Sequence, residues 1–143
     1  MAETSPNTRL ETFCDGVFAI AMTLLIIDIK IPSTIEIGDT PGLWAALKHI
    51  APSIFAFILS FIIILITWVN HHNIFKLVKR SSTSFIYANG FLLLTVVFLP
   101  FPTSLLGEYL LTDHSSPAVV LYNFTLVAQA MGWTLLTGAA IRN

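Results

Sequence analysis

Four long apolar segments dominate this sequence, and each is near the roughly 20 residues that a helix needs to cross a lipid bilayer. They run over about 11–31, 43–70, 84–106 and 116–141, with short polar connections between them. Of the 143 residues, 55% are hydrophobic and only 10% are charged, whereas a soluble domain has about 25% charged residues. So few charges cannot cover a water-facing surface. The sequence therefore predicts an all-α integral membrane protein with about four transmembrane helices in a single domain, residues 1–143.

The basic residues predict how these helices are oriented. Five of the seven fall at the ends of the segments that share one side of the membrane, namely Arg9, Lys76, Lys79, Arg80 and Arg142. Lysine and arginine are enriched in cytoplasmic connections, so we expect the N-terminus on the cytoplasmic side of the cell membrane. No small-residue cleavage site clearly follows the first apolar run. We therefore expect that run to remain as the first of several membrane-spanning helices.

Charge and cysteine content exclude several classes of function. The net charge is −1, which argues against a nucleic-acid partner. The single cysteine, Cys14, predicts neither a disulfide framework nor a zinc site. The serine and threonine residues show no arrangement with His and Asp at a common depth, so we do not expect an enzyme. We also expect no cofactor.

The first apolar segment carries a stripe of large apolar side chains. Its members recur at spacings of three and four and therefore share one helix face: Phe13, Val17, Ile20, Leu24, Ile27 and Ile31. Asp15 and Asp28 lie near the two ends of the segment. A carboxylate at membrane depth is expensive unless it faces protein or water. The segment thus reads as an interior helix, which either lines a path or packs against neighbouring helices, with Asp15 then paired to Arg9 or a histidine.

A path along this stripe would need several copies of the chain. Four helices of one small chain can hardly enclose a wide conduit, and membrane oligomers usually form closed rings. Stacked rings of Ile20, Leu24 and Ile27 would gate by dewetting. Ions that lose water readily would pass more easily, which favours potassium over sodium, and Thr23 could offer its hydroxyl to a partly dehydrated ion. Asp28 would then lie at the pore mouth.

The start of the first segment resembles a known signature. The pattern Arg9-x-x-x-Phe13-x-Asp15, followed by Gly-Val-Phe-Ala-Ile-Ala-Met-Thr-Leu-Leu over 16–25, is similar to the Arg-x-x-x-Phe-Ser-Asp signature of bacterial members of the transmembrane protein 175 potassium-channel family. Further similarity lies in Trp68-x-Asn70-His71-His72, Asn89 and Pro100-Phe101-x-Thr103. The resemblance extends over essentially the whole chain.

This resemblance implies a homotetrameric, potassium-selective leak-type channel whose pore lies on a fourfold axis. The first helix would line that pore, with Ile20, Leu24 and Ile27 as the constriction and Thr23 linked to selectivity. The family also implies a hydrogen-bonded network at the cytoplasmic end that holds the first three helices together; it maps to Arg9, Phe13, Asp15, Trp68 and His71 or His72. Potassium would be the permeant ion, and we expect no other metal.

The chain departs from the family pattern in two ways. Cys14 stands where the family has serine, and because a thiol is a weaker donor than a hydroxyl, we expect a looser network. Family members have six helices per subunit, whereas this sequence shows four, so it is either a short member or part of a longer protein.

Two other interpretations concern the histidines and the overall role. Adjacent residues on a helix point about 100° apart, so His71 and His72 are expected to have an interfacial structural role instead of binding one metal ion. Gly132 and Gly138 are expected to allow close helix approach. The alternative to a channel is a small membrane scaffold or a transporter subunit without its own pore.

Overall fold

The computed structural model describes residues 7–33 and 38–142, and the remaining residues of the predicted single domain lie outside this description. The helices are α1 (Thr8–Ile27), α3 (Thr40–His49), α4 (Ala51–Leu77), α5 (Thr83–Phe98), α6 (Pro100–Tyr109) and α7 (Ser115–Ile141). In the described residues, α1, α4, the α5–α6 pair and α7 are long and apolar enough to cross a membrane. The prediction of an all-α chain with about four such helices is confirmed.

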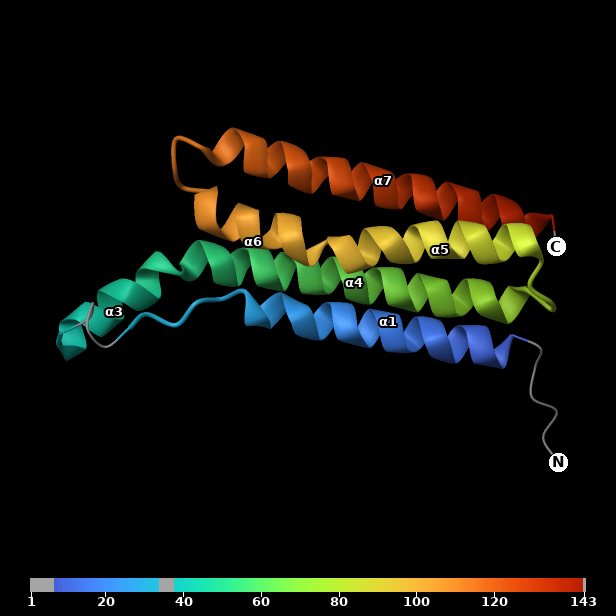
Figure 1. Ribbon diagram of the computed structural model, residues 1–143, viewed down its shortest axis with the longest axis horizontal. Coiled ribbons are helices and arrows are strands. Elements are labelled where there is room, and N and C mark those ends of the chain that lie inside the picture. The colour runs from blue at the N-terminus through green and yellow to red at the C-terminus, as the bar shows by residue number, and fades with distance from the viewer. Residues whose placement is uncertain (1–6, 34–37, 143) are drawn as a thin grey trace, which may run out of the picture.

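The four spans lie side by side in one bundle (Figure 1). Helix α1 packs against α4, α5 and α6, while α7 packs against α5 and α6. The start of α1 and the end of α7 lie at the same end of the bundle, and the short helix α3 projects at the opposite end (Figure 1). The ends of α4 and α7 that carry Lys76 and Arg142 therefore lie at the end where α1 begins with Arg9.

The second predicted segment, 43–70, is not one helix. It is divided into α3 and α4 at Ile50, and α4 begins with Pro52 in its first turn, where proline's missing N–H has no helical partner to lose. Helix α4 also continues to Leu77 because Phe75 is buried and its ring meets that of Phe85 at 5.2 Å. The histidine pair consequently lies within α4, and not in a connection.

The first predicted segment, 11–31, is displaced along the chain. Helix α1 spans Thr8–Ile27 and ends with Asp28 as its C-cap. It starts earlier than expected because Asn7 is buried and tied to the α4–α5 connection: its Nδ2 donates to the Val78 carbonyl at 2.7 Å, and its Oδ1 accepts from the Ser81 N–H at 2.9 Å and from the Ser81 hydroxyl at 2.8 Å.

The third span bends at Leu99, between α5 and α6. Pro100 and Pro102 carry no N–H, so two backbone hydrogen bonds of a continuous helix cannot form here. The Leu99 N–H is shared between the carbonyls of Thr95 at 3.1 Å and Val96 at 3.3 Å. The span is thus divided into two helices at these prolines, and it extends to Tyr109.

Two glycines allow helices to approach closely. A Cβ on Gly132 would lie 3.1 Å from the Leu92 Cα, and one on Gly107 would lie 2.7 Å from the Ser53 Cα. Small residues at such crossings let membrane helices pack backbone to backbone. The expectation was right for Gly132 and wrong for Gly138, where an added Cβ would meet nothing within 4 Å. The closest approach, at Gly107, was not predicted.

Candidate pore-lining helix and the contacts behind it

Helix α1 has one buried face and one open face. The buried face consists of Cys14, Phe18, Ala21 and Leu25, each at most 2% exposed. The open face carries much of the predicted stripe: Ile20 is 61% exposed, Leu24 39% and Ile27 71%. Thr23 is exposed as well, and its hydroxyl donates to the Ile20 carbonyl at 2.9 Å. The neighbouring helices therefore cover the opposite side of α1 and leave these four residues uncovered.

Two of the other stripe residues differ from this central part. Phe13 is 62% exposed like Ile20, but Val17 is half-buried against the core, and Ile31 lies beyond the end of α1. Asp28 was predicted to lie at the pore mouth, beyond the end of the stripe. It is exposed but lines a small cavity with Leu25 of the buried face and with Glu108 of α6. Since it caps the helix between the two faces, Asp28 turns toward α4 and α6 rather than continuing the stripe.

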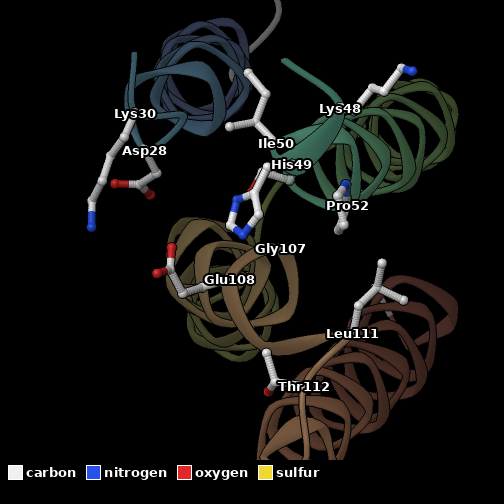
Figure 2. Close-up of a pocket in the computed structure, with 11 residues that line it drawn as sticks. Asp28, Lys30, Lys48, His49, Ile50, Pro52, Gly107, Glu108, Leu111 and Thr112 are labelled. Atoms are coloured by element: carbon white, nitrogen blue, oxygen red, sulfur yellow. The ribbon is translucent and has the colours of Figure 1, made fainter. Parts of the chain in front are cut away.

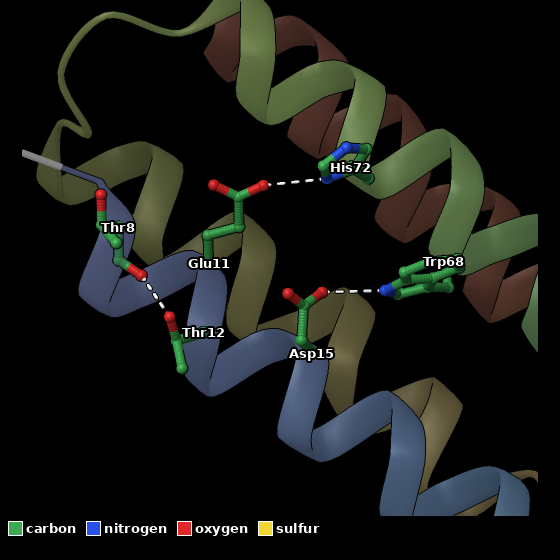
Figure 3. A network of polar contacts seen from close by, with 6 residues as sticks. All are labelled: Thr8, Glu11, Thr12, Asp15, Trp68 and His72. Carbon is green, nitrogen blue, oxygen red and sulfur yellow. Dashed lines mark hydrogen bonds and ion pairs between the residues drawn. The ribbon is translucent and has the colours of Figure 1, made fainter. Parts of the chain in front are cut away.

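Two polar contacts join successive turns of α1 to successive turns of α4 (Figure 3). The Trp68 indole Nε1–H donates to Asp15 Oδ1 at 2.8 Å, and His72 Nδ1 lies 2.9 Å from Glu11 Oε1. The Trp68 and His72 rings stack with 6.2 Å between their centroids. Because Glu11 and Asp15 are four residues apart, as are Trp68 and His72, each pair presents its polar groups on one helix face.

A second contact chain lies deeper and joins α4, α5 and α1. His71 Nε2 lies 2.7 Å from Asn89 Oδ1, and Asn89 Nδ2 donates to Cys14 Sγ at 3.2 Å. All three side chains are buried. Since an amide oxygen only accepts, His71 carries its proton on Nε2 in this arrangement. The Phe18 ring packs edge-on against the His71 ring at 5.1 Å, which encloses it in apolar surface.

The predicted network is thus assembled in part. Asp15, Trp68, His71 and His72 all contribute polar contacts between helices. Phe13 and Arg9 are both exposed. Within residues 7–33 and 38–142, the Arg9 side chain forms no hydrogen bond and no ion pair. The expected pairing of Asp15 with Arg9 or a histidine is wrong, because the Trp68 indole occupies the carboxylate. Glu11 was missed, although its four-residue spacing from Asp15 could have indicated it.

The described part of the chain contains no group of three His, Cys, Asp or Glu side chains placed to hold a metal ion. Its polar residues instead bond to one another across helix contacts. This arrangement gives α1 a fixed position and leaves Ile20, Thr23, Leu24 and Ile27 among its exposed residues. The family model for the endosomal/lysosomal potassium channel TMEM175 matches residues 9–100, which include most of α1 and all of α4 and α5.

The chain belongs to the TMEM175 family. Among curated TMEM175 relatives, a protein named potassium channel from Chamaesiphon minutus is 48% identical over 129 residues, covering 90% of this chain and 63% of the relative. One of the same description from Streptomyces collinus is 45% identical, covering 90% and 61%. The chicken protein named endosomal/lysosomal proton channel TMEM175 is 30% identical, covering 94% of this chain and 29% of its own length.

The fold agrees with a solved TMEM175 structure. The crystal structure of a lysosomal potassium-selective channel TMEM175 homologue from Chamaesiphon minutus matches with a TM-score of 0.88 and 46% identity, covering 93% of this chain and 70% of that one. The chain spans a little under two thirds of the length of the bacterial curated relatives it matches. It is a multi-pass membrane protein of an ion-channel family, and ion channels are not an enzyme class.

Proposed function

We propose that this protein is a potassium-selective channel of the cell membrane, with its N-terminus in the cytoplasm. Four copies surround a fourfold axis, and α1 of each copy lines the pore. The observation that carries the proposal is the open face of α1. Ile20, Leu24 and Ile27 of its stripe remain exposed in the protomer, while the opposite face of the same helix is buried to 2% exposure or less.

The constriction consists of rings of Ile20, Leu24 and Ile27. Water leaves a narrow aliphatic tube readily, so such rings act as a hydrophobic gate. Thr23 lies on the exposed side of α1 beside Leu24 and offers an oxygen to an ion that has lost part of its hydration shell. Potassium is the permeant ion and not a resident cofactor. Asp28, expected at the pore mouth, is left out of the proposed ion path because it lines a cavity with Leu25 and Glu108.

The contacts behind α1 hold the pore wall in position. The bonds of Asp15 to Trp68 and of Glu11 to His72 lie on the side of α1 that faces α4. Movement of α1 relative to α4 would break them together, so the network couples the position of the constriction to the rest of the protomer. This assigns the network a positioning role, outside the ion path.

The test is ion flux from proteoliposomes that contain the purified chain, under a potassium gradient and then an equal sodium gradient. We expect potassium flux that exceeds sodium flux. Leu24→Ala is expected to change the flux or the ratio of the two ions, because it widens the constriction. Ile26→Ala is the matched control: Ile26 is also exposed, at 52%, but lies outside the stripe.

The alternative is a membrane scaffold or transporter subunit without its own pore. In that case Leu24→Ala would alter stability only, and neither ion would cross a membrane containing folded, oligomeric protein. Absence of flux for both ions would therefore overturn the channel proposal for this chain.

A further inference from the structure

A cavity of about 270 Å³ lies at the α3 end of the bundle, between the α3–α4 turn and α6 (Figure 2). Its lining includes ionisable groups of both signs, namely Asp28, Lys30, Lys48, His49 and Glu108. None of the five forms a salt bridge with another group in 7–33 or 38–142. Unpaired charges of both signs around one concave site are the pattern expected for a ligand that itself carries both signs.

The charged groups are not evenly spread around the cavity. Figure 2 shows the carboxylates of Asp28 and Glu108 on the same side of the cavity as Lys30. The His49 imidazole lies between these carboxylates and α4. Lys48 extends away from this group in the same view. The carboxylates can accept hydrogen bonds from a cation, while Lys30 and His49 can donate to an anion.

A second, narrower cavity of about 20 Å³ adjoins the first, with which it shares Asp28, Ser53 and Glu108. Its remaining lining consists of the apolar residues Leu25, Ile29 and Phe57 and of Ser104 and Thr103, whose hydroxyl already donates to the Leu99 carbonyl. A space of this size holds about one water molecule. A recess of that size that presents the Asp28 and Glu108 carboxylates and the Ser53 hydroxyl suits a primary ammonium group with its three donors. It is too small for a quaternary ammonium, which proteins bind in aromatic cages.

The position of the cavity places it at the level of lipid headgroups. Asp28 directly follows α1, Ser53 is in the first turn of α4, and Glu108 is in the last turn of α6, so the cavity lies where three apolar spans end. Helix α3 at the same end has no buried residue, and its Trp44 is 65% exposed. Tryptophan is enriched at membrane–water interfaces.

We propose that this cavity binds a phospholipid whose headgroup carries a phosphate and a primary ammonium, as phosphatidylethanolamine does. The ammonium lies between Asp28 and Glu108 at the narrow recess, and the phosphate lies beside Lys30 and His49. The site is separate from the stripe on α1 and does not depend on ion conduction.

The experiment is lipid binding to the purified, delipidated full chain, measured by native mass spectrometry. The probes are short-chain phosphatidylethanolamine, and phosphatidylcholine and phosphatidylglycerol with the same acyl chains. We expect phosphatidylethanolamine to bind about tenfold more tightly than either of the others, a difference of about 1.4 kcal/mol. Equal binding of the three lipids would overturn the proposal.

Variants assign the binding to the cavity. Glu108→Gln is expected to abolish the preference for phosphatidylethanolamine, because it removes a carboxylate beside the ammonium. Lys30→Gln is expected to weaken the binding of all three lipids, since each carries the phosphate, and Lys30→Arg to retain it. Lys76→Gln, an exposed position at the opposite end of the bundle, is the control and should bind as the unaltered chain does. Size-exclusion profiles establish that each variant is folded. An unchanged preference in Glu108→Gln, or unchanged binding of all three lipids in Lys30→Gln, would refute the assignment.

A soluble zwitterion could in principle supply the same chemistry as the lipid. Glycerophosphoethanolamine, which has the headgroup without acyl chains, distinguishes the two sources. We expect it to bind far more weakly than the short-chain lipid. If it binds as tightly, the ligand is a soluble molecule and the lipid proposal is wrong.

Discussion

The Trp68 indole Nε1–H donates a hydrogen bond to Asp15 Oδ1 at 2.8 Å, which joins the middle of α4 to the first half of α1. Both side chains are half-buried in the bundle. A carboxylate in this setting needs a donor, since an unpaired one at membrane depth is expensive. The bond therefore fixes where α1 stands against α4, and through α1 the direction of its open face.

Replacing Trp68 with phenylalanine removes this donor and retains an aromatic ring. We expect Trp68→Phe to lower the free energy of unfolding by about 1.5–3 kcal/mol, the range for a hydrogen bond to a charged group. Asp15→Asn should have a smaller effect because the amide oxygen still accepts. The measurement is the midpoint temperature at which the monodisperse protein is lost on heating in detergent.

Trp44→Phe provides the matched control for that experiment. Trp44 is 65% exposed on α3, and no hydrogen bond of its indole is found within the described ranges. We expect its free energy of unfolding to stay within about 0.5 kcal/mol of that of the unaltered chain, as is usual for surface substitutions. If Trp68→Phe and Trp44→Phe behave alike, the bond to Asp15 does not stabilise the fold.

Cys14 accepts a hydrogen bond from Asn89 at 3.2 Å and is completely buried. A hydroxyl is a stronger hydrogen-bonding group than a thiol, so Cys14→Ser should keep the contact with Asn89 and change stability little. Cys14→Ala leaves the Asn89 amide without that partner and should cost about 1–3 kcal/mol, the penalty for an unsatisfied buried group. Thermal unfolding of the two variants makes the comparison, and equal loss in both would show that the contact contributes nothing.

The sequence predicted the spans and the direction of the stripe because both follow from local patterns. Apolar runs of membrane length identify helices, and spacings of three and four placed Ile20, Leu24 and Ile27 on one face, which the fold leaves uncovered. The signature at Arg9 to Asp15 also indicated the family that the comparison then established.

Contacts between distant parts of the chain could not be predicted in the same way. Asn7 bonds to Val78 and Ser81, more than 70 residues away, and no pattern near Asn7 indicates these partners. The close approach of Gly107 to Ser53 likewise depends on how α6 crosses α4. The turn of Asp28 toward α6 depends on the helix ending at Ile27, and helix ends are the least certain part of a sequence-based assignment.

Gly107 tests whether the close crossing of α4 and α6 matters for stability. An added Cβ would lie 2.7 Å from the Ser53 Cα, a backbone atom that cannot rotate away. We expect Gly107→Ala to destabilise the fold by about 1–3 kcal/mol, as overpacking usually does. Gly138→Ala is the control. Nothing lies within 4 Å of its Cβ position, so it should gain about 0.5–1 kcal/mol of helix propensity.

The same detergent unfolding assay separates these two glycines. Ser53→Gly removes the side chain at the crossing and should recover little of the loss in Gly107→Ala, because the conflict is mainly with the backbone. Equal stability of the two glycine variants would mean that α6 can shift away from α4 without loss.

The Ser60 hydroxyl joins three helices inside the bundle, and its removal tests how buried polar contacts contribute here. Its Oγ lies 2.6 Å from Thr103 Oγ1 and 2.9 Å from Tyr122 Oη, and Ser60 itself is completely buried. Tyr122→Phe removes one of these contacts, and we expect a loss of about 0.6–2 kcal/mol, as measured for such bonds between membrane helices. Ser60→Ala removes both contacts and should cost more. Thr103 keeps its bond to the Leu99 carbonyl at 2.7 Å, so the loss stays below the sum of two full bonds.

Because Ser60→Ala already lacks the partner of Tyr122, adding Tyr122→Phe to it should change stability little, and the double-mutant cycle should give a coupling close to the Tyr122→Phe value. Additive losses would mean that the two hydroxyls act independently and that the tyrosine oxygen has another partner.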